Sequence, residues 1–225
     1  MTDALSIAKK YFNVVPRDAG EYKTVKSGMM TANAEPYYIE GVGSMTFQKA
    51  KAMFGLMKMD MMVITPRDRD LPLFSFDIID AMGNYTLIIE MYDVMLNKSE
   101  KFEADINDFV SIKNKYKDLP DNDLGEHWYD NLKLTSCVSK KAKKKDIAEA
   151  CDKLYAEYLE KYFEMAKSME EVEDKDAKRI KSEEYVNGLL SNGGPSTDQF
   201  VKMIGLEKTT EYFSKVIFGT AKELS

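Results

Sequence analysis

The sequence contains few of the residues that build metal centres and covalent cross-links. It has one histidine and two cysteines, Cys137 and Cys151, in 225 residues. Two cysteines without metal-ligand spacing are too few for a disulfide framework. A histidine-based zinc site or a Ser-His-Asp triad would depend entirely on His127. The low cysteine content is typical of a reducing compartment, so we expect a cytoplasmic protein.

Three further absences narrow the class of partner. No Gly-x-x-x-x-Gly-Lys motif is present, which argues against P-loop chemistry. The net charge of −6 argues against general nucleic-acid binding, which needs a basic surface. No run approaches the ~20 apolar residues of a membrane span, and the charged start of the chain is not a signal peptide. We therefore expect neither a nucleic acid nor a membrane as partner.

What remains is an ordinary globular composition, with 44% hydrophobic and 31% charged residues. The length suffices for one domain over residues 1–225 with a full core. Fifteen methionines are present, and four of them lie close together: Met57, Met59, Met61 and Met62. Methionine fills irregular gaps in cores and also adapts to bulky ligands, and core filling is the simpler interpretation.

The order of predicted elements places most strands before most helices. After a short helix over residues 3–12, strands and turns are expected over 21–43, a hairpin over 45–65, and a second hairpin over 73–92 that turns at Met82-Gly83-Asn84. Helices are predicted over 100–117, from a cap at Asp146 past Met165, from a cap at Ser196 or Thr197 to Gly205, and over 206–218. A strand is expected over 128–138, a linker or helix end over 170–181, and a loop over 192–195. This order favours an α/β (α+β) fold with an antiparallel sheet covered by helices.

The apolar stretch over residues 73–79 contains the first candidate for chemistry. Side chains alternate between the two faces of a strand, and one face is wholly apolar: Phe74, Phe76 and Ile78. The other face carries Asp77 among apolar neighbours. A carboxyl group that has lost water has a raised pKa and can donate a proton near neutral pH. Pattern alone favours a structural carboxylate here, because buried networks also contain acids.

Two other polar residues have competing interpretations. Glu90 interrupts the apolar strand over residues 85–92 and must face either a cavity or water, and strand alternation favours water. His127 follows Gly125-Glu126 at the start of an expected strand, where a surface position is the simpler interpretation.

A basic cluster stands out on this acidic chain, and it consists of Lys140, Lys141, Lys143, Lys144 and Lys145. The default interpretation is an exposed turn. The functional interpretation is a docking site for an acidic partner protein, reached by electrostatic steering.

Three stretches in consistent order resemble the ferredoxin-dependent bilin reductases and the related red chlorophyll catabolite reductases. The first is Leu71-Pro72-Leu73-Phe74-Ser75-Phe76-Asp77, and the second is Gly125-Glu126-His127-Trp128-Tyr129. The third combines Tyr185, the Asn192-Gly193-Gly194-Pro195 loop, Phe200, Ile204-Gly205, Tyr212 and Val216-Ile217-Phe218. The likeness spans roughly residues 20–219.

This resemblance implies an α/β/α sandwich with a central antiparallel sheet flanked by helices. It implies reduction of a linear tetrapyrrole such as biliverdin, with electrons from ferredoxin or flavodoxin, protons from acidic side chains and no bound cofactor. Asp77 matches the family's proton-donating aspartate, and the lysine cluster becomes a candidate dock for the electron donor. We expect substrate contacts from Met61, Ser75, Glu90 and Asn192.

The chain departs from the family pattern at three positions. The family's histidine on the preceding strand falls near Met61, a glutamate of one branch falls near Lys49, and the second aspartate falls in the Asn192-Gly193 loop. Two functions therefore stay open. One is a bilin reductase that uses Asp77, and the other is a binding protein for a tetrapyrrole or haem that carries out no chemistry.

Overall fold

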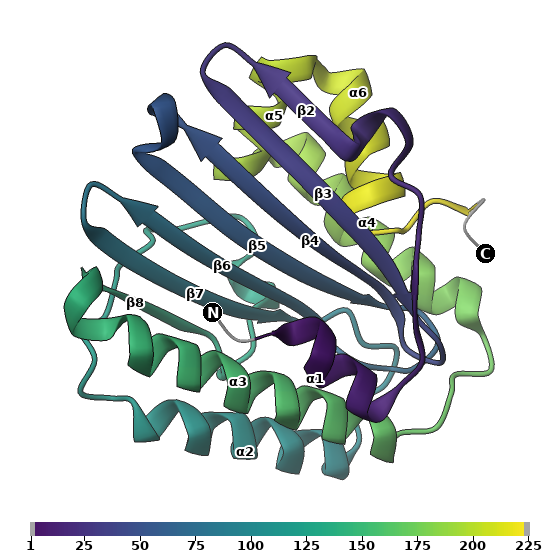
Figure 1. Cartoon of the computed structure of the whole chain (residues 1–225). Coiled ribbons are helices and arrows are strands. Elements are labelled where there is room, and N and C mark those ends of the chain that lie inside the picture. The colour runs from purple at the N-terminus through teal and green to yellow at the C-terminus, as the bar shows by residue number, and fades with distance from the viewer. Residues whose placement is uncertain (1–2, 223–225) are drawn as a thin grey trace.

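One antiparallel sheet separates two layers of helices in the computed structural model, which describes residues 3–222 (Figure 1). The strands are β1 (Val14–Pro16), β2 (Thr24–Ser27), β3 (Met30–Ile39), β4 (Gly43–Ala52), β5 (Met57–Pro66), β6 (Leu73–Ala81), β7 (Asn84–Tyr92) and β8 (Val138–Lys143). Their order is β1-β3-β4-β5-β6-β7-β8, and β2 also pairs with β3.

The helices divide between the two faces of the sheet. One layer contains α1 (Ala4–Tyr11), α2 (Glu100–Lys115) and α3 (Lys144–Ser168). The other contains α4 (Lys175–Asn192), α5 (Pro195–Ile204), α6 (Leu206–Glu211) and the π-helix η4 (Tyr212–Ile217) that continues α6. Short 3₁₀ helices lie in the connections: η1 (Gly20–Lys23), η2 (Met53–Gly55) and η3 (Asp130–Leu132). The predicted α/β/α sandwich is confirmed.

The apolar face of β6 packs against α3, as its alternation predicts. Phe74, Phe76 and Ile78 are almost fully buried in one cluster with the apolar stripe of α3. The Phe76 ring stacks on the Tyr155 ring with centroids 3.5 Å apart. This face of the sheet is therefore closed core, and the opposite face is the one available to a ligand.

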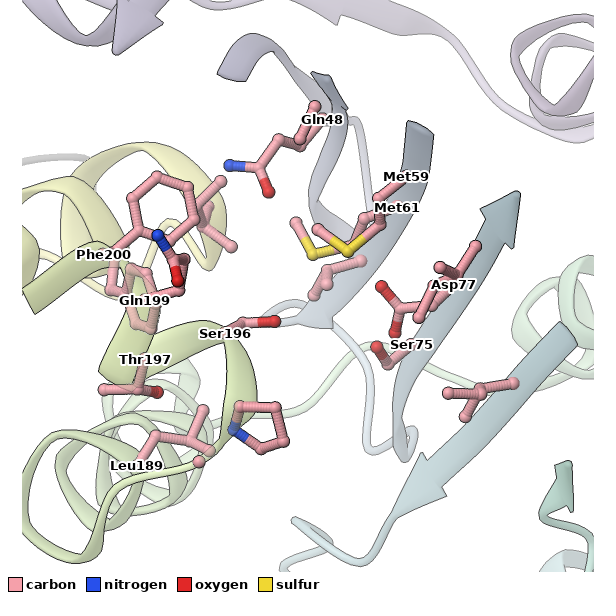
Figure 2. Close-up of a pocket in the computed structure, with 18 of the residues that line it drawn as sticks. Gln48, Met59, Met61, Ser75, Asp77, Leu189, Ser196, Thr197, Gln199 and Phe200 are labelled. Carbon is pink, nitrogen blue, oxygen red and sulfur yellow. The ribbon is translucent and has the colours of Figure 1, made fainter. Parts of the chain in front are cut away.

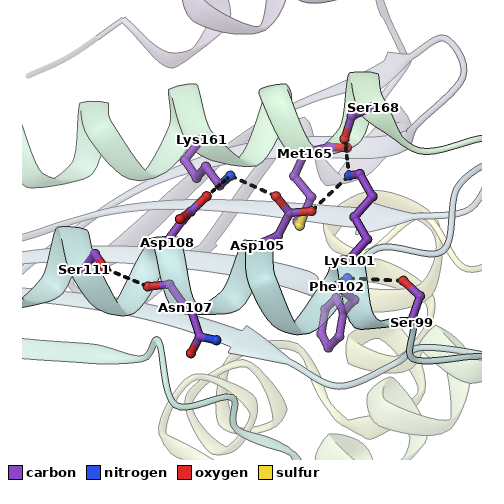
Figure 3. Close-up of polar contacts among 10 residues, drawn as sticks. All are labelled: Ser99, Lys101, Phe102, Asp105, Asn107, Asp108, Ser111, Lys161, Met165 and Ser168. Carbon is purple, nitrogen blue, oxygen red and sulfur yellow. Dashed lines mark hydrogen bonds and ion pairs between the residues drawn. The ribbon is translucent and has the colours of Figure 1, made fainter.

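Charged side chains join α2 to α3 at the outside of this layer (Figure 3). Lys161 of α3 contacts Asp105 at 2.8 Å and Asp108 at 2.6 Å, and Lys101 contacts Asp105 at 3.1 Å. Ser99 caps α2 by accepting a hydrogen bond from the Phe102 amide. Partly exposed ion pairs each contribute little free energy. Of these ion pairs only those of Lys161 link the two helices, because Lys101 and Asp105 both lie on α2.

Buried polar bonds attach the C-terminal layer to the sheet. The Thr46 hydroxyl donates to the Val216 carbonyl at 2.7 Å. The Gln48 amide donates to the Tyr212 hydroxyl at 2.5 Å. Burying these groups without partners would cost free energy, so the bonds hold η4 in place over β4.

Several element predictions are wrong in detail. Residues 128–137 form a turn, η3 and a loop rather than a strand, because the Asp130 carboxylate accepts a hydrogen bond from the His127 amide and the Asp130 amide donates to the His127 carbonyl, which closes a turn over these residues. The cap of α3 is Lys143. Asp146 lies in the first turn of the helix, where the helix dipole stabilises a negative charge. The charged run over 170–181 is a linker only as far as Asp174, the N-cap of α4.

The lysine cluster is not an exposed turn. Lys140 to Lys143 lie on the edge strand β8, and Lys144 begins α3. Lys140 is only 4% exposed, and its ammonium group is held by the Asp121 carboxylate at 2.7 Å and the Leu119 carbonyl at 2.9 Å. Lys140 is therefore removed from the predicted docking surface, whereas its four neighbours are exposed.

Within residues 3–222, no helix is both long and apolar enough to cross a bilayer.

Candidate functional site

A cavity of about 560 Å³ lies between the open face of the sheet and the C-terminal helices (Figure 2). Its floor is made by strands β4 to β7, and its roof by α4, α5 and the residues around η4. The loop that contains His127 and Tyr129 closes one side. The volume and the mostly apolar lining are typical of a small-molecule site.

Strand register gathers the predicted site residues on the floor. Met61 of β5 is paired with Asp77 of β6, and Ser75 is paired with Glu90 of β7. All four side chains line the cavity. Asp77 and Glu90 are diagonal neighbours across β6 and β7, and such neighbours lie about 7–8 Å apart, so the two carboxyl groups share one region of the floor. Figure 2 shows Met61, Ser75 and Asp77 pointing into the same space.

Asp77 is an acid without a cation. Removal from water, and secondly the negative charge of Glu90, raise the pKa of Asp77 from 3.8 to about 7. The cavity leaves its side chain partly accessible, but protein atoms surround it on the remaining sides and replace most of its hydration. Among residues 3–222, no lysine, arginine or histidine forms an ion pair with it. Near neutral pH, Asp77 is therefore protonated in a substantial fraction of molecules.

Glu90 has close polar partners, in contrast to Asp77. Lys133 contacts its carboxylate at 2.8 Å, and the Tyr92 hydroxyl donates to it at 2.5 Å. Lys133 also contacts Asp130 at 2.8 Å. Glu90 is 9% exposed and faces the cavity, so the alternation argument that pointed it towards water is wrong. The two carboxyl groups therefore lie in different environments: Glu90 contacts a lysine, and Asp77 has no cation partner among residues 3–222.

His127 lies at the cavity rather than on the open surface that we expected. Its ring stacks on the Tyr129 ring at 4.9 Å with an interplanar angle of 11°, which turns the loop inwards. The Nδ1 atom is buried and has no hydrogen-bond partner among the described residues.

The roof comes from α5 and the end of α4. Pro195 occupies the first turn of α5, and the side chains of Ser196, Thr197 and Phe200 line the cavity opposite the sheet (Figure 2). Asn192, from which we expected a substrate contact, does not line the cavity. Helix α4 continues through Asn192, and the side-chain amide of Asn192 donates a hydrogen bond to the Gly188 carbonyl at 3.1 Å.

Several lining residues gave no clear signal in the sequence. Gln48 lies in an ambiguous stretch of alternating residues. The sequence indicates Ser196 or Thr197 only as a helix cap, and that prediction is wrong because the cap of α5 is Gly194. Tyr185 and Phe200 belong to the third resembling stretch, but no contact was assigned to them. A group of three or more histidine, cysteine or acidic side chains suited to a metal ion is absent from residues 3–222.

Comparisons with known proteins give one kind of match. No protein-family model matches the chain, and no curated protein matches it in sequence. Among solved structures, phytochromobilin synthase from tomato, crystallised in complex with biliverdin, is similar with a TM-score of 0.78 at 11% sequence identity. The match covers 99% of this chain and 82% of that chain. The chain therefore has the fold of phytochromobilin synthase.

Proposed function

We propose that this protein binds a linear tetrapyrrole in the cavity and reduces it, with Asp77 as the proton donor. The observation that carries the proposal is a carboxyl group with a pKa of about 7 on the floor of an apolar cavity. A structure with the same fold holds biliverdin, which supports the class of ligand. An acid whose pKa lies near the working pH is suited to proton transfer.

The lining suits a large conjugated ligand. Met59 and Met61 cover part of the floor, and Phe200 faces them from the roof. Methionine side chains are polarizable and adapt to the face of an aromatic ring system. Lys51 lines the cavity where it meets solvent and is the charge that would attract a ligand carboxylate.

The proposed reaction adds two electrons and two protons to the tetrapyrrole. A one-electron donor such as ferredoxin or flavodoxin supplies the electrons in two steps. After each electron, Asp77 passes one proton to the ligand and becomes a carboxylate, which takes up a proton again from water that reaches the cavity. Asp77 thereby delivers both protons. The charge of Glu90 favours that reprotonation, because it disfavours a second anion nearby. In this proposal the chain holds no cofactor of its own, and it works in the cytoplasm.

The electron donor is proposed to dock at the exposed lysines beside β7. Lys141, Lys143, Lys144 and Lys145 are exposed, although Lys144 already pairs with Asp80. An acidic donor would be attracted to this edge, and the attraction would weaken as salt is added. A drop in turnover for Lys141→Glu with Lys143→Glu, rescued by a higher donor concentration, tests this assignment.

One observation favours binding without chemistry as a second candidate. Met61 is paired with Asp77, at the position near which the resembling family carries a histidine. A thioether cannot supply or store a proton. A tetrapyrrole or haem carrier would keep the apolar cavity and would need no proton supply.

A spectroscopic titration separates these candidates. Biliverdin and haem are added to purified protein, and the visible spectrum is followed. Reduced ferredoxin is then added to the biliverdin complex without oxygen. Binding followed by an absorbance change that Asp77→Asn abolishes supports the reductase, with Asp80→Asn on the same strand as the control. Tight binding with no spectral change after reduced ferredoxin is added supports the carrier. Failure to bind either ligand contradicts both.

A further inference from the structure

A second feature of the molecule is a row of exposed apolar side chains at one end of the sheet. We define the apolar rim as the exposed residues of three hairpin turns: Met29, Met53, Phe54, Leu56 and Met82. Phe54 is 92% exposed and Met82 is 79% exposed. The turns lie at the same end of the strands, because β2–β3, β4–β5 and β6–β7 all reverse there (Figure 1). The Met82 amide even donates to the Leu56 carbonyl across two turns.

The backbone of the rim is held in an unfavourable conformation. Among residues 3–222, the non-glycine residues with positive φ are Met53, Phe54 and Met82, at 51°, 57° and 52°. Asparagine, aspartate or glycine is the favoured residue in such turns. Large apolar side chains at these positions cost conformational free energy and are exposed to water as well. Neither folding nor packing of the described residues explains them.

The charge around the rim is opposite to that of the whole chain. Lys26, Lys51 and Lys58 are exposed beside the turns and form no ion pair with a described residue. Lys51 and Lys58 are direct partners across the β4–β5 hairpin, which places like charges opposite each other. The nearest acid is Asp80 of β6, which is the cross-strand partner of Lys58 and whose carboxylate is paired with Lys144. A protein with a net charge of −6 thus presents a basic, apolar end.

We propose that this end of the molecule docks on an anionic lipid bilayer. Apolar side chains that project from separate turns enter the acyl boundary, and the lysines contact acidic headgroups. A fluid bilayer accommodates separate projections, whereas a folded partner would need a matching surface. The earlier expectation that excludes a membrane partner rests on the lack of a spanning segment, and that lack has no bearing on surface binding.

The rim also lies at the mouth of the cavity. Met29, Lys51 and Met53 belong both to the exposed end and to the cavity lining, which continues inwards past Met59 to Asp77. Docking would therefore place the mouth of the cavity against the bilayer. An apolar ligand could then pass between lipid and cavity without crossing water.

Vesicle co-sedimentation tests the proposal with the full chain. We expect binding to phosphatidylcholine vesicles that contain about 30 mol% phosphatidylserine, weaker binding to phosphatidylcholine alone, and loss of the difference at high salt. The double variant Phe54→Asn with Met82→Asn should bind at least about tenfold more weakly. Because asparagine tolerates positive φ, that variant should fold with an unchanged or higher melting temperature. Lys51→Glu should weaken binding to the anionic vesicles alone.

The matched control removes an exposed apolar side chain elsewhere. Ile180 is 44% exposed on α4, near the end of the sheet where Lys175 contacts Asp68. Ile180→Gln should bind vesicles like the wild type. Equal sedimentation with and without phosphatidylserine, or wild-type binding by the double variant, overturns the proposal. Self-association of the wild type that the double variant abolishes, without vesicle binding, assigns the rim to a second copy and also overturns it.

Discussion

Replacing Asp77 by asparagine should stabilise the protein at alkaline pH, the opposite of what a structural carboxylate would do. The pKa of Asp77 is about 7 in the folded chain and 3.8 as its ordinary value. As pH rises from about 4 to 8, the unfolded chain releases this proton first, so the wild type loses stability over that range. With ~1.4 kcal/mol for each tenfold change in the protonation equilibrium, the full difference corresponds to about 4 kcal/mol.

Part of this penalty is relieved when water enters the cavity and solvates the ionised carboxylate, so we expect ~2–4 kcal/mol. Asparagine does not titrate. The stability of Asp77→Asn relative to the wild type should therefore rise by that amount between about pH 4.5 and pH 8. At the higher pH this corresponds to a melting temperature higher by ~5–10 °C.

Urea unfolding followed by circular dichroism at a series of pH values measures the effect. Asp105 supplies the contrasting control, because its carboxylate is held by Lys101 and Lys161. Asp105→Asn should destabilise the protein by ~1–2 kcal/mol at pH 8. If Asp77→Asn is also destabilising at pH 8, or if its effect does not change with pH, then Asp77 is a satisfied structural group and the reasoning is refuted.

Three further changes test other parts of the structure. A Cβ at Gly188 would lie 2.2 Å from the Trp128 ring, so Gly188→Ala should displace the single tryptophan, red-shift its fluorescence and cost ~1–3 kcal/mol; an unchanged spectrum would contradict this packing. Phe76→Ala should lower the free energy of unfolding by ~3–5 kcal/mol in urea, since the ring is 1% exposed; a loss below 1 kcal/mol would show that the ring is not core. Met61→His places an imidazole that can carry a positive charge opposite Asp77, and it should lower the pKa of the Asp77 carboxyl as measured by carbon NMR; an unchanged pKa would contradict the pairing of residues 61 and 77 across β5 and β6.

The fold could be predicted from the sequence where local pattern and tertiary environment agree. The hairpins over β4–β5 and β6–β7 have alternating strands and turns at Gly55 and Gly83, so both appear as expected. Alternation also placed Asp77 and Ser75 on the face away from the core, and that face became the cavity floor.

The remaining differences arise from contacts between distant segments. His127 looked like a surface residue because no local pattern reports its stacking on Tyr129 or the enclosure of its loop. Lys140 looked exposed because its partner Asp121 lies in a separate loop. Asn192 looked like a loop residue, but the helix continues until Gly193, whose φ of 79° ends it. In each case the deciding contact lies outside the window that a sequence pattern samples.

The most direct test of the central proposal is single turnover of bound biliverdin with reduced ferredoxin, measured for the wild type and for Asp77→Asn over a range of pH. We predict a wild-type rate that falls as pH rises through about 7 and a rate at least about a hundredfold lower for the variant, although both proteins bind biliverdin. A variant that binds biliverdin and reduces it at the wild-type rate would contradict the proposal that Asp77 donates the proton.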